Sequence, residues 1–174
     1  MKRNQNGFTL IELLITLGIM SFITAMVFGL FIINFNNYVT INNDSRLQFQ
    51  SQYILNFVSN KIMESKCVEV ILTGTSSLLK AKSEYSISKI SLRYGIYNHN
   101  CFIFEVRNNK IYYGNSFSYD SADVELGIYV KELKVAPYPE GKTFAESSAL
   151  KITLYLISDG QEYVARQIVY MRNS

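Results

Sequence analysis

Hydrophobic residues are concentrated near the N-terminus, where a long apolar segment follows a short basic leader. No charged residue occurs from Leu13 to Asn43. At about 1.5 Å per residue, a helix over this segment is longer than the roughly 30 Å hydrocarbon core of a bilayer. Lys2 and Arg3 precede it and Asp44 is the first charge after it, so the positive-inside rule keeps the N-terminus in the cytoplasm. The pattern predicts one membrane-spanning helix, with the rest of the chain exported.

The apolar segment is predicted to stay in the mature protein. A cleaved secretory signal has an apolar core of roughly 7–15 residues and a small-residue cleavage site, whereas this segment is about twice as long and lacks such a site. Glu12 lies at its start, where an unpaired acid costs on the order of a few kcal/mol. The segment contains no Lys or Arg, so a free amine is the available cation. Cleavage after Gly7 would create that amine at Phe8.

The segment that follows the apolar run is predicted to continue as helix. The range 34–43 is rich in Asn and β-branched residues, which favours a frayed or kinked stretch. Beyond Asp44 an amphipathic pattern predicts helix to about Ser65. Its apolar face consists of Leu47, Ile54, Phe57, Val58 and Ile62, and its polar face of Gln48, Gln52, Asn56, Ser59 and Asn60.

Beyond the helix, short runs rich in Ile, Val, Tyr and Phe indicate strands of an antiparallel sheet. The predicted strands are Val68–Leu72, Leu78–Lys82, Ile87–Tyr97, Cys101–Arg107, Lys110–Tyr113, Ile128–Ala136, Leu150–Ser158 and Glu162–Arg172. Asn108-Asn109 and Asp159-Gly160 are predicted hairpin turns. The last hairpin has an apolar face, Leu150, Ile152, Leu154 and Leu156, which should pack on the amphipathic helix. The predicted fold class is therefore α+β, with two long irregular stretches at 114–127 and 137–148 as places for variable function.

Length and charge add limited information. The 174 residues leave room for one modest soluble domain after the apolar helix. The net charge is +3, but loss of Lys2 and Arg3 would bring the 17 basic residues close to balance with the 14 acidic residues. Charge alone therefore indicates no partner.

Two features of the sequence admit a structural or a functional interpretation. Cys67 and Cys101 either close one disulfide, which an exported protein can retain, or remain buried free thiols. Small residues recur at helical spacing inside the apolar segment and form one stripe, well away from Glu12, where another helix can approach. The stripe consists of Gly18, Ser21, Ala25 and Gly29.

The N-terminus resembles the class III signal of type IV prepilins, because Lys2-Arg3 is followed by Gly7-Phe8-Thr9-Leu10-Ile11-Glu12. In that family a prepilin peptidase cuts after the Gly and methylates the new N-terminal Phe, and the acid pairs with a neighbouring subunit's N-terminus. The resemblance assigns cleavage to Gly7 and Phe8, methylation to Phe8 and assembly to Glu12. It implies the type IV pilin fold, divided into a leader (1–7), a transmembrane or filament-core helix (8–35), its amphipathic continuation (36–66) and a β-sheet head (67–174).

The order of the later elements is most similar to PilW-type minor pilins and to pseudopilins of type II secretion and competence. The similarity rests on the run 90–94, the run 130–135 and the ending Val169-Tyr170-Met171-Arg172-Asn173. It implies a subunit held in the cytoplasmic membrane and later in a surface filament, which helps to start assembly or lies near the tip. Implied partners are the peptidase, other pilin subunits and the inner-membrane assembly platform. A secretion pseudopilin, or a head that binds DNA or a surface ligand, is the alternative.

No strong catalytic, cofactor or metal signature is present. His99 and Cys101 form a weak candidate pair because a third positioning group is missing. Asp120, Asp123 and Glu125 lack the spacing of an EF-hand calcium loop and are expected to be a solvated acidic loop. Basic residues near tyrosines could attract DNA, although such a pattern is ordinary for the wet face of a sheet. These residues are Lys80, Lys82, Lys89 and Arg93, with Tyr85, Tyr94 and Tyr97. We expect no enzyme activity, cofactor or metal.

Overall fold

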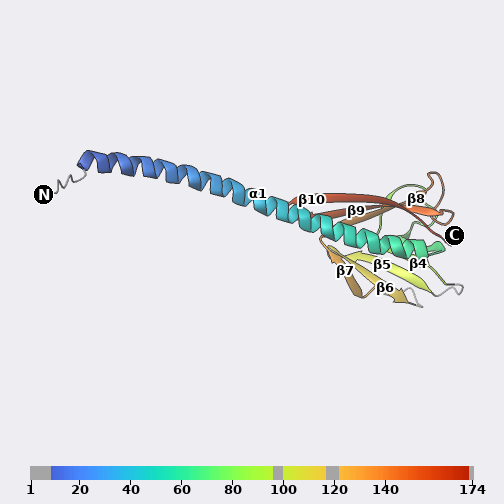
Figure 1. The fold of residues 1–174 in the computed structure, drawn as a ribbon. Helices are drawn as coiled ribbons and strands as arrows, with labels where there is room; N and C mark the ends of the chain where they lie inside the picture. Colours follow the sequence, from blue (N-terminus) through green and yellow to red (C-terminus); the bar gives the residue numbers. More distant parts are fainter. Residues whose placement is uncertain (1–8, 96–99, 117–121, 173–174) are drawn as a thin grey trace. The chain divides into compact units, whose positions relative to one another are not determined.

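The computed structural model describes residues 9–95, 100–116 and 122–172, and consists of one long helix followed by short and long strands (Figure 1). The elements are α1 (Leu10–Glu64), β1 (Cys67–Thr73), β2 (Ser76–Ser77), β3 (Tyr85–Ser86), β4 (Lys89–Arg93), β5 (Cys101–Arg107), β6 (Lys110–Ser116), β7 (Val124–Ile128), β8 (Val130–Tyr138), β9 (Ala149–Ser158) and β10 (Gln161–Tyr170). The chain divides into two units, Met1–Asn42 and Asn43–Ser174.

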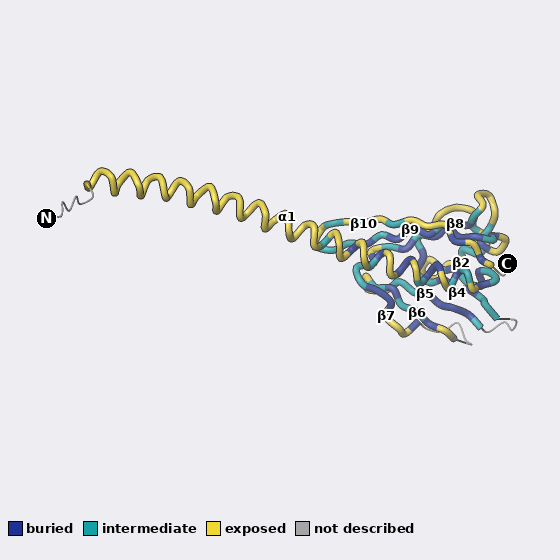
Figure 2. The backbone as a smooth tube through the Cα atoms, viewed as in Figure 1, coloured by how far each residue is buried: buried dark blue, intermediate teal, exposed yellow. Residues whose placement is uncertain are grey.

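The N-terminal unit contains the apolar part of α1, and every described residue in it is exposed (Figure 2). The predicted fraying at 34–43 is wrong, because every residue there is helical, whereas the predicted kink stays a prediction. The Asn34 side-chain amide donates to the Leu30 carbonyl at 2.8 Å, and the Thr40 hydroxyl donates to the Asn36 carbonyl at 3.1 Å. These polar side chains are satisfied by the backbone one turn earlier, so they do not interrupt the helix.

In the second unit, the predicted apolar face of α1 is the core face. Leu47, Ile54, Val58 and Ile62 are all less than 5% exposed, and Phe57 packs against them. Ser59 was expected on the polar face but is buried, which corrects that part of the prediction. Its hydroxyl donates to the Gln167 side chain of β10 at 3.0 Å, and this hydrogen bond compensates for burial of the polar group.

The strands form two antiparallel sheets rather than one. The first sheet has the order β2-β1-β4-β5-β6-β7 and the second β10-β9-β8-β3. Within this unit α1 runs between them, with β4 to β7 on one side and β8 to β10 on the other (Figure 1). Apolar residues from the helix and both sheets join in one core. The α+β class is confirmed, with a long N-terminal apolar helix packed on antiparallel sheets as in the type IV pilin fold.

The last hairpin and both predicted turns are confirmed. Leu150, Ile152, Leu154 and Leu156 are at most 1% exposed. Asn108 and Asn109 have φ of 52° and 57°, and Asp159 and Gly160 have φ of 50° and 80°. Two consecutive positive φ values are typical of the two-residue turns that suit the twist of a hairpin.

One predicted strand and one predicted irregular stretch are wrong. The range 78–82 forms a turn, in which the Ala81 amide donates to the Leu78 carbonyl at 2.9 Å, and its apolar side chains pack against the core from that turn. The stretch expected to be irregular at 114–127 contains the end of β6 and most of β7. β7 is only five residues long and contains Gly127 and Glu125, two residue types that are depleted in strands, so its local strand signal is weak.

Candidate functional site

The first turn of α1 places Thr9 and Glu12 together. The Thr9 carbonyl accepts the Glu12 backbone N–H at 3.1 Å, and the Thr9 hydroxyl makes long contacts of 3.4 Å with both the Glu12 backbone N–H and its carboxylate. Thr9 is therefore the N-cap residue, and its hydroxyl contact with the Glu12 backbone N–H is one half of a capping box. The helix therefore begins directly after the predicted cleavage point.

The Glu12 carboxylate is exposed and keeps most of its acceptor capacity. Within residues 9–95, 100–116 and 122–172, no Lys or Arg forms an ion pair with it. Gly7 and Phe8, with the rest of the leader, lie outside the described residues. Cleavage, methylation and the four-part division of the chain remain predictions.

The small residues of α1 form an open helix face. The Ser21 hydroxyl donates to the Gly18 carbonyl at 2.9 Å, so it does not project a free polar group. A shallow hollow runs along this face, lined by Leu17, Met20, Ser21, Thr24, Ala25 and Phe28. A Cβ atom at Gly18 or Gly29 would meet nothing within 4 Å. Packing within the chain therefore does not explain these glycines, each of which costs a helix interior about 1 kcal/mol relative to Ala.

Among the residues that the structure describes, α1 is the one helix long and apolar enough to cross a membrane. Its most apolar window has a mean hydropathy of 2.3, and none of that window is buried within the chain. An unburied apolar helix of this length needs a lipid environment or other helices around it.

Cys67 and Cys101 are both free thiols, which corrects the disulfide alternative. Cys67 of β1 is the register partner of Arg93 of β4, and Arg93 is in turn the partner of Cys101 of β5. Because adjacent strands lie about 4.8 Å apart, the two cysteines are roughly 10 Å apart, beyond the Cα separation that a disulfide spans.

Some of the head residues that were considered for calcium or DNA binding make contacts within the fold instead. Glu125 forms an ion pair of 2.7 Å with Lys110 across β6 and β7, and Arg93 forms one of 3.4 Å with Glu69. The Tyr94 ring stacks on Phe102 with centroids 4.1 Å apart. His99, Tyr97 and Asp120 lie outside the described residues.

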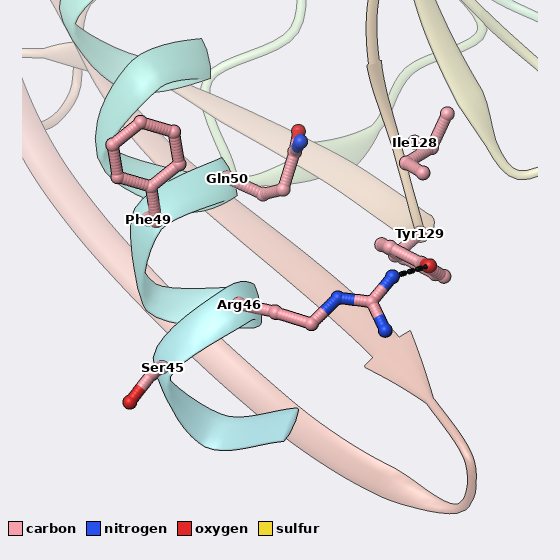
Figure 3. Close-up of a pocket in the computed structure, with 6 residues that line it drawn as sticks. All are labelled: Ser45, Arg46, Phe49, Gln50, Ile128 and Tyr129. Carbon is pink, nitrogen blue, oxygen red and sulfur yellow. Dashed lines mark hydrogen bonds between the residues drawn. The ribbon is translucent and has the colours of Figure 1, made fainter. Parts of the chain in front are cut away.

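Sequence analysis missed a surface groove between α1 and the β7–β8 junction (Figure 3). It is lined by Ser45, Arg46, Phe49, Gln50, Ile128 and Tyr129. The Arg46 guanidinium donates to the Tyr129 hydroxyl, and Phe49 is 70% exposed. Phe49 and Tyr53 occupy the otherwise polar side of the amphipathic helix, and those two aromatic residues were the signal that could have indicated the groove.

Comparison with known proteins gives one match. No curated protein and no solved structure matches the chain significantly. Residues 2–28 match the family described as the prokaryotic N-terminal methylation motif. The match covers the basic leader, the Gly7–Phe8 junction, Glu12 and most of the apolar part of α1. This motif indicates a type IV pilin-like or pseudopilin-like chain with a prepilin-type signal, and it favours a structural role.

Proposed function

We propose that this chain is a minor pilin-like subunit of a type IV pilus or a related filament, incorporated through its N-terminal helix after processing by prepilin peptidase. The observation that carries the proposal is the methylation motif at residues 2–28, which ends in a helix whose N-cap, Thr9, follows the cleavage point by one residue. The described helix begins at Leu10, two residues after the proposed new N-terminus at Phe8. The methyl group is added to the new N-terminal amine of Phe8.

Electrostatics explains why processing and assembly are coupled. Before cleavage, Glu12 lies at the start of an apolar helix with no cation from the described residues beside it. Cleavage after Gly7 creates an ammonium at Phe8, and the Glu12 carboxylate of one subunit pairs with that ammonium on the next. In a low-dielectric helix bundle such a pair is favourable, whereas either charge alone is costly. The leader therefore keeps the subunit in the membrane until the peptidase acts.

The face of α1 that carries the small residues is where neighbouring subunits pack. Gly18 and Gly29 have open space where a Cβ would lie, so a neighbouring helix can approach the backbone closely. The subunit is held in the cytoplasmic membrane by α1 before assembly and lies in a surface filament afterwards. Its partners are prepilin peptidase, other pilin subunits and the inner-membrane assembly platform, and its role is to help start the filament or to lie near its tip.

The intact mass of the protein purified from membranes tests this proposal. We expect a mass that lacks residues 1–7 and carries one added methyl group. A Gly7→Glu variant is the matched control, and it should retain the full leader and the unmodified mass. Retention of Met1 to Gly7 in the unaltered chain would overturn the proposal.

A further inference from the structure

Four chemically active side chains gather on the face of the first sheet that points away from α1. Cys67, Arg93 and Cys101 are successive register partners on β1, β4 and β5. Leu92 and Phe102 belong to the core, so the alternation of side chains along a strand sends Arg93 and Cys101 to the opposite face. Glu69 joins the group through its ion pair with Arg93. The filament function assigned above uses none of these residues.

Arg93 acts as a cationic partner for one of the two thiols. Its Nη2 donates to the Cys67 Sγ at 3.1 Å, while its Nε lies 3.4 Å from the Glu69 carboxylate. The pKa of Arg93 is raised, chiefly by the hydrogen bond to Cys67. A guanidinium that donates directly to sulfur favours the thiolate, which is the nucleophilic form of cysteine.

The two cysteines differ in their surroundings. Cys67 is partly exposed, and the side chains of Arg93 and Glu69 beside it are 31% and 27% exposed, so reagents can reach the sulfur. Cys101 is 1% exposed, and burial raises its thiol pKa. Cys67 is therefore the more reactive thiol, because it is more exposed and lies beside the Arg93 guanidinium.

We propose that Cys67 is a covalent modification site, at which the thiolate held by Arg93 forms mixed disulfides with low-molecular-weight disulfides. The fold supports an intermolecular product because Cys101 is two strands away. The Cys67 sulfur attacks one sulfur of the disulfide, so one S–S bond forms and one breaks. The departing thiolate takes a proton from water, and no further oxidant is needed. Arg93 loses its contact with a thiolate and keeps its ion pair with Glu69.

Thiol reactivity of the full chain in detergent micelles tests the proposal. The probes are 5,5′-dithiobis(2-nitrobenzoic acid) for rates and oxidised glutathione for the mass of the product. A Cys101→Ser variant should react at least about tenfold faster than a Cys67→Ser variant, because only the former retains the exposed, Arg-paired thiol. In the Cys101→Ser background, Arg93→Gln should slow the reaction at pH 7 about three- to tenfold. The range allows for the higher nucleophilicity of a more basic thiolate.

Glu69→Gln in the same background is the matched control. It removes the competing anion from Arg93, so the rate at pH 7 should rise. Each of the two substitutions is also made in a chain that retains Cys101, where protection of that buried thiol shows that the head is folded. If Arg93→Gln exposes Cys101, the reaction rate of the Glu69→Gln variant alone decides. Equal rates for the two single-thiol variants, or a Cys67 reaction rate that neither substitution changes, would overturn the proposal.

Discussion

Gly127 of β7 lies directly against Ile54 of α1, and a Cβ atom at Gly127 would be only 2.5 Å from the Ile54 Cδ1. Ile54 is fully buried, so its side chain has little room to move away. Gly127→Ala should therefore force the helix and β7 apart. We expect the free energy of unfolding to fall by about 1–3 kcal/mol, as is usual for an overpacked core, measured by urea denaturation in detergent micelles.

A double-mutant cycle tests the cause of that loss. Ile54→Ala alone should cost about 2–5 kcal/mol because it leaves a cavity. Combined with Gly127→Ala, it should cost less than the sum of the two changes, because the new methyl group occupies space that Ile54 has vacated. Gly29→Ala is the control, since nothing lies within 4 Å of its Cβ position, and it should not lower stability. Strict additivity would contradict the proposed clash.

The contact at Gly127 also illustrates what sequence patterns can and cannot predict. The helix and the last hairpin are long and strongly periodic, so their core faces follow from the spacing of Leu47, Ile54, Leu150 and Ile152. β7 has only five residues, so the alternation of Val124, Leu126 and Ile128 with Glu125 and Gly127 is too short to identify a strand by itself. It forms because β6 supplies its hydrogen bonds and α1 covers Leu126 and Gly127. The sequence of a short strand does not show which distant segment it will pair with.

The functional residues also differ in how far they can be predicted from the sequence. The residues of the methylation motif are contiguous, so Gly7, Phe8 and Glu12 are recognisable from the sequence. The Cys67–Arg93 contact joins residues from two strands, and it depends on the register and on the bulge between Val68 and Val70. Spacing along the chain carries no information about either, so the sequence left the disulfide and the free thiols equally open.

Glu12→Ala should leave membrane insertion intact but prevent incorporation into filaments, because the carboxylate that pairs with a neighbouring Phe8 ammonium is lost. The measurement is the amount of the variant in sheared surface filaments relative to the membrane fraction. Glu12→Gln is the informative companion, because Gln retains the capping contact with Thr9 and loses only the charge. Both variants should fail to incorporate. Normal incorporation of Glu12→Gln would mean that the acid serves helix capping alone.

Gly29→Leu should reduce filament incorporation at least several-fold while leaving the folded head unchanged, because a bulky side chain would occupy the space where a second helix approaches. The same fractionation measures incorporation, and thermal unfolding of the head serves as the check on folding. Val27→Phe places similar bulk on the opposite face of α1 and is the matched control. Equal loss from both substitutions would indicate general crowding rather than packing on the small-residue face.

Alkaline pH should destabilise the head through Cys101. Burial raises the pKa of this thiol, so the unfolded chain releases the proton first as pH rises above about 8.5. The contribution of Cys101 to stability is therefore complete below that pH and is lost progressively as pH rises toward the folded-state pKa. Urea denaturation at pH 7 and pH 9.5 measures the effect. Cys101→Ala should flatten the decline, whereas Cys67→Ala should not, and an unchanged slope in Cys101→Ala would contradict the role of the buried thiol.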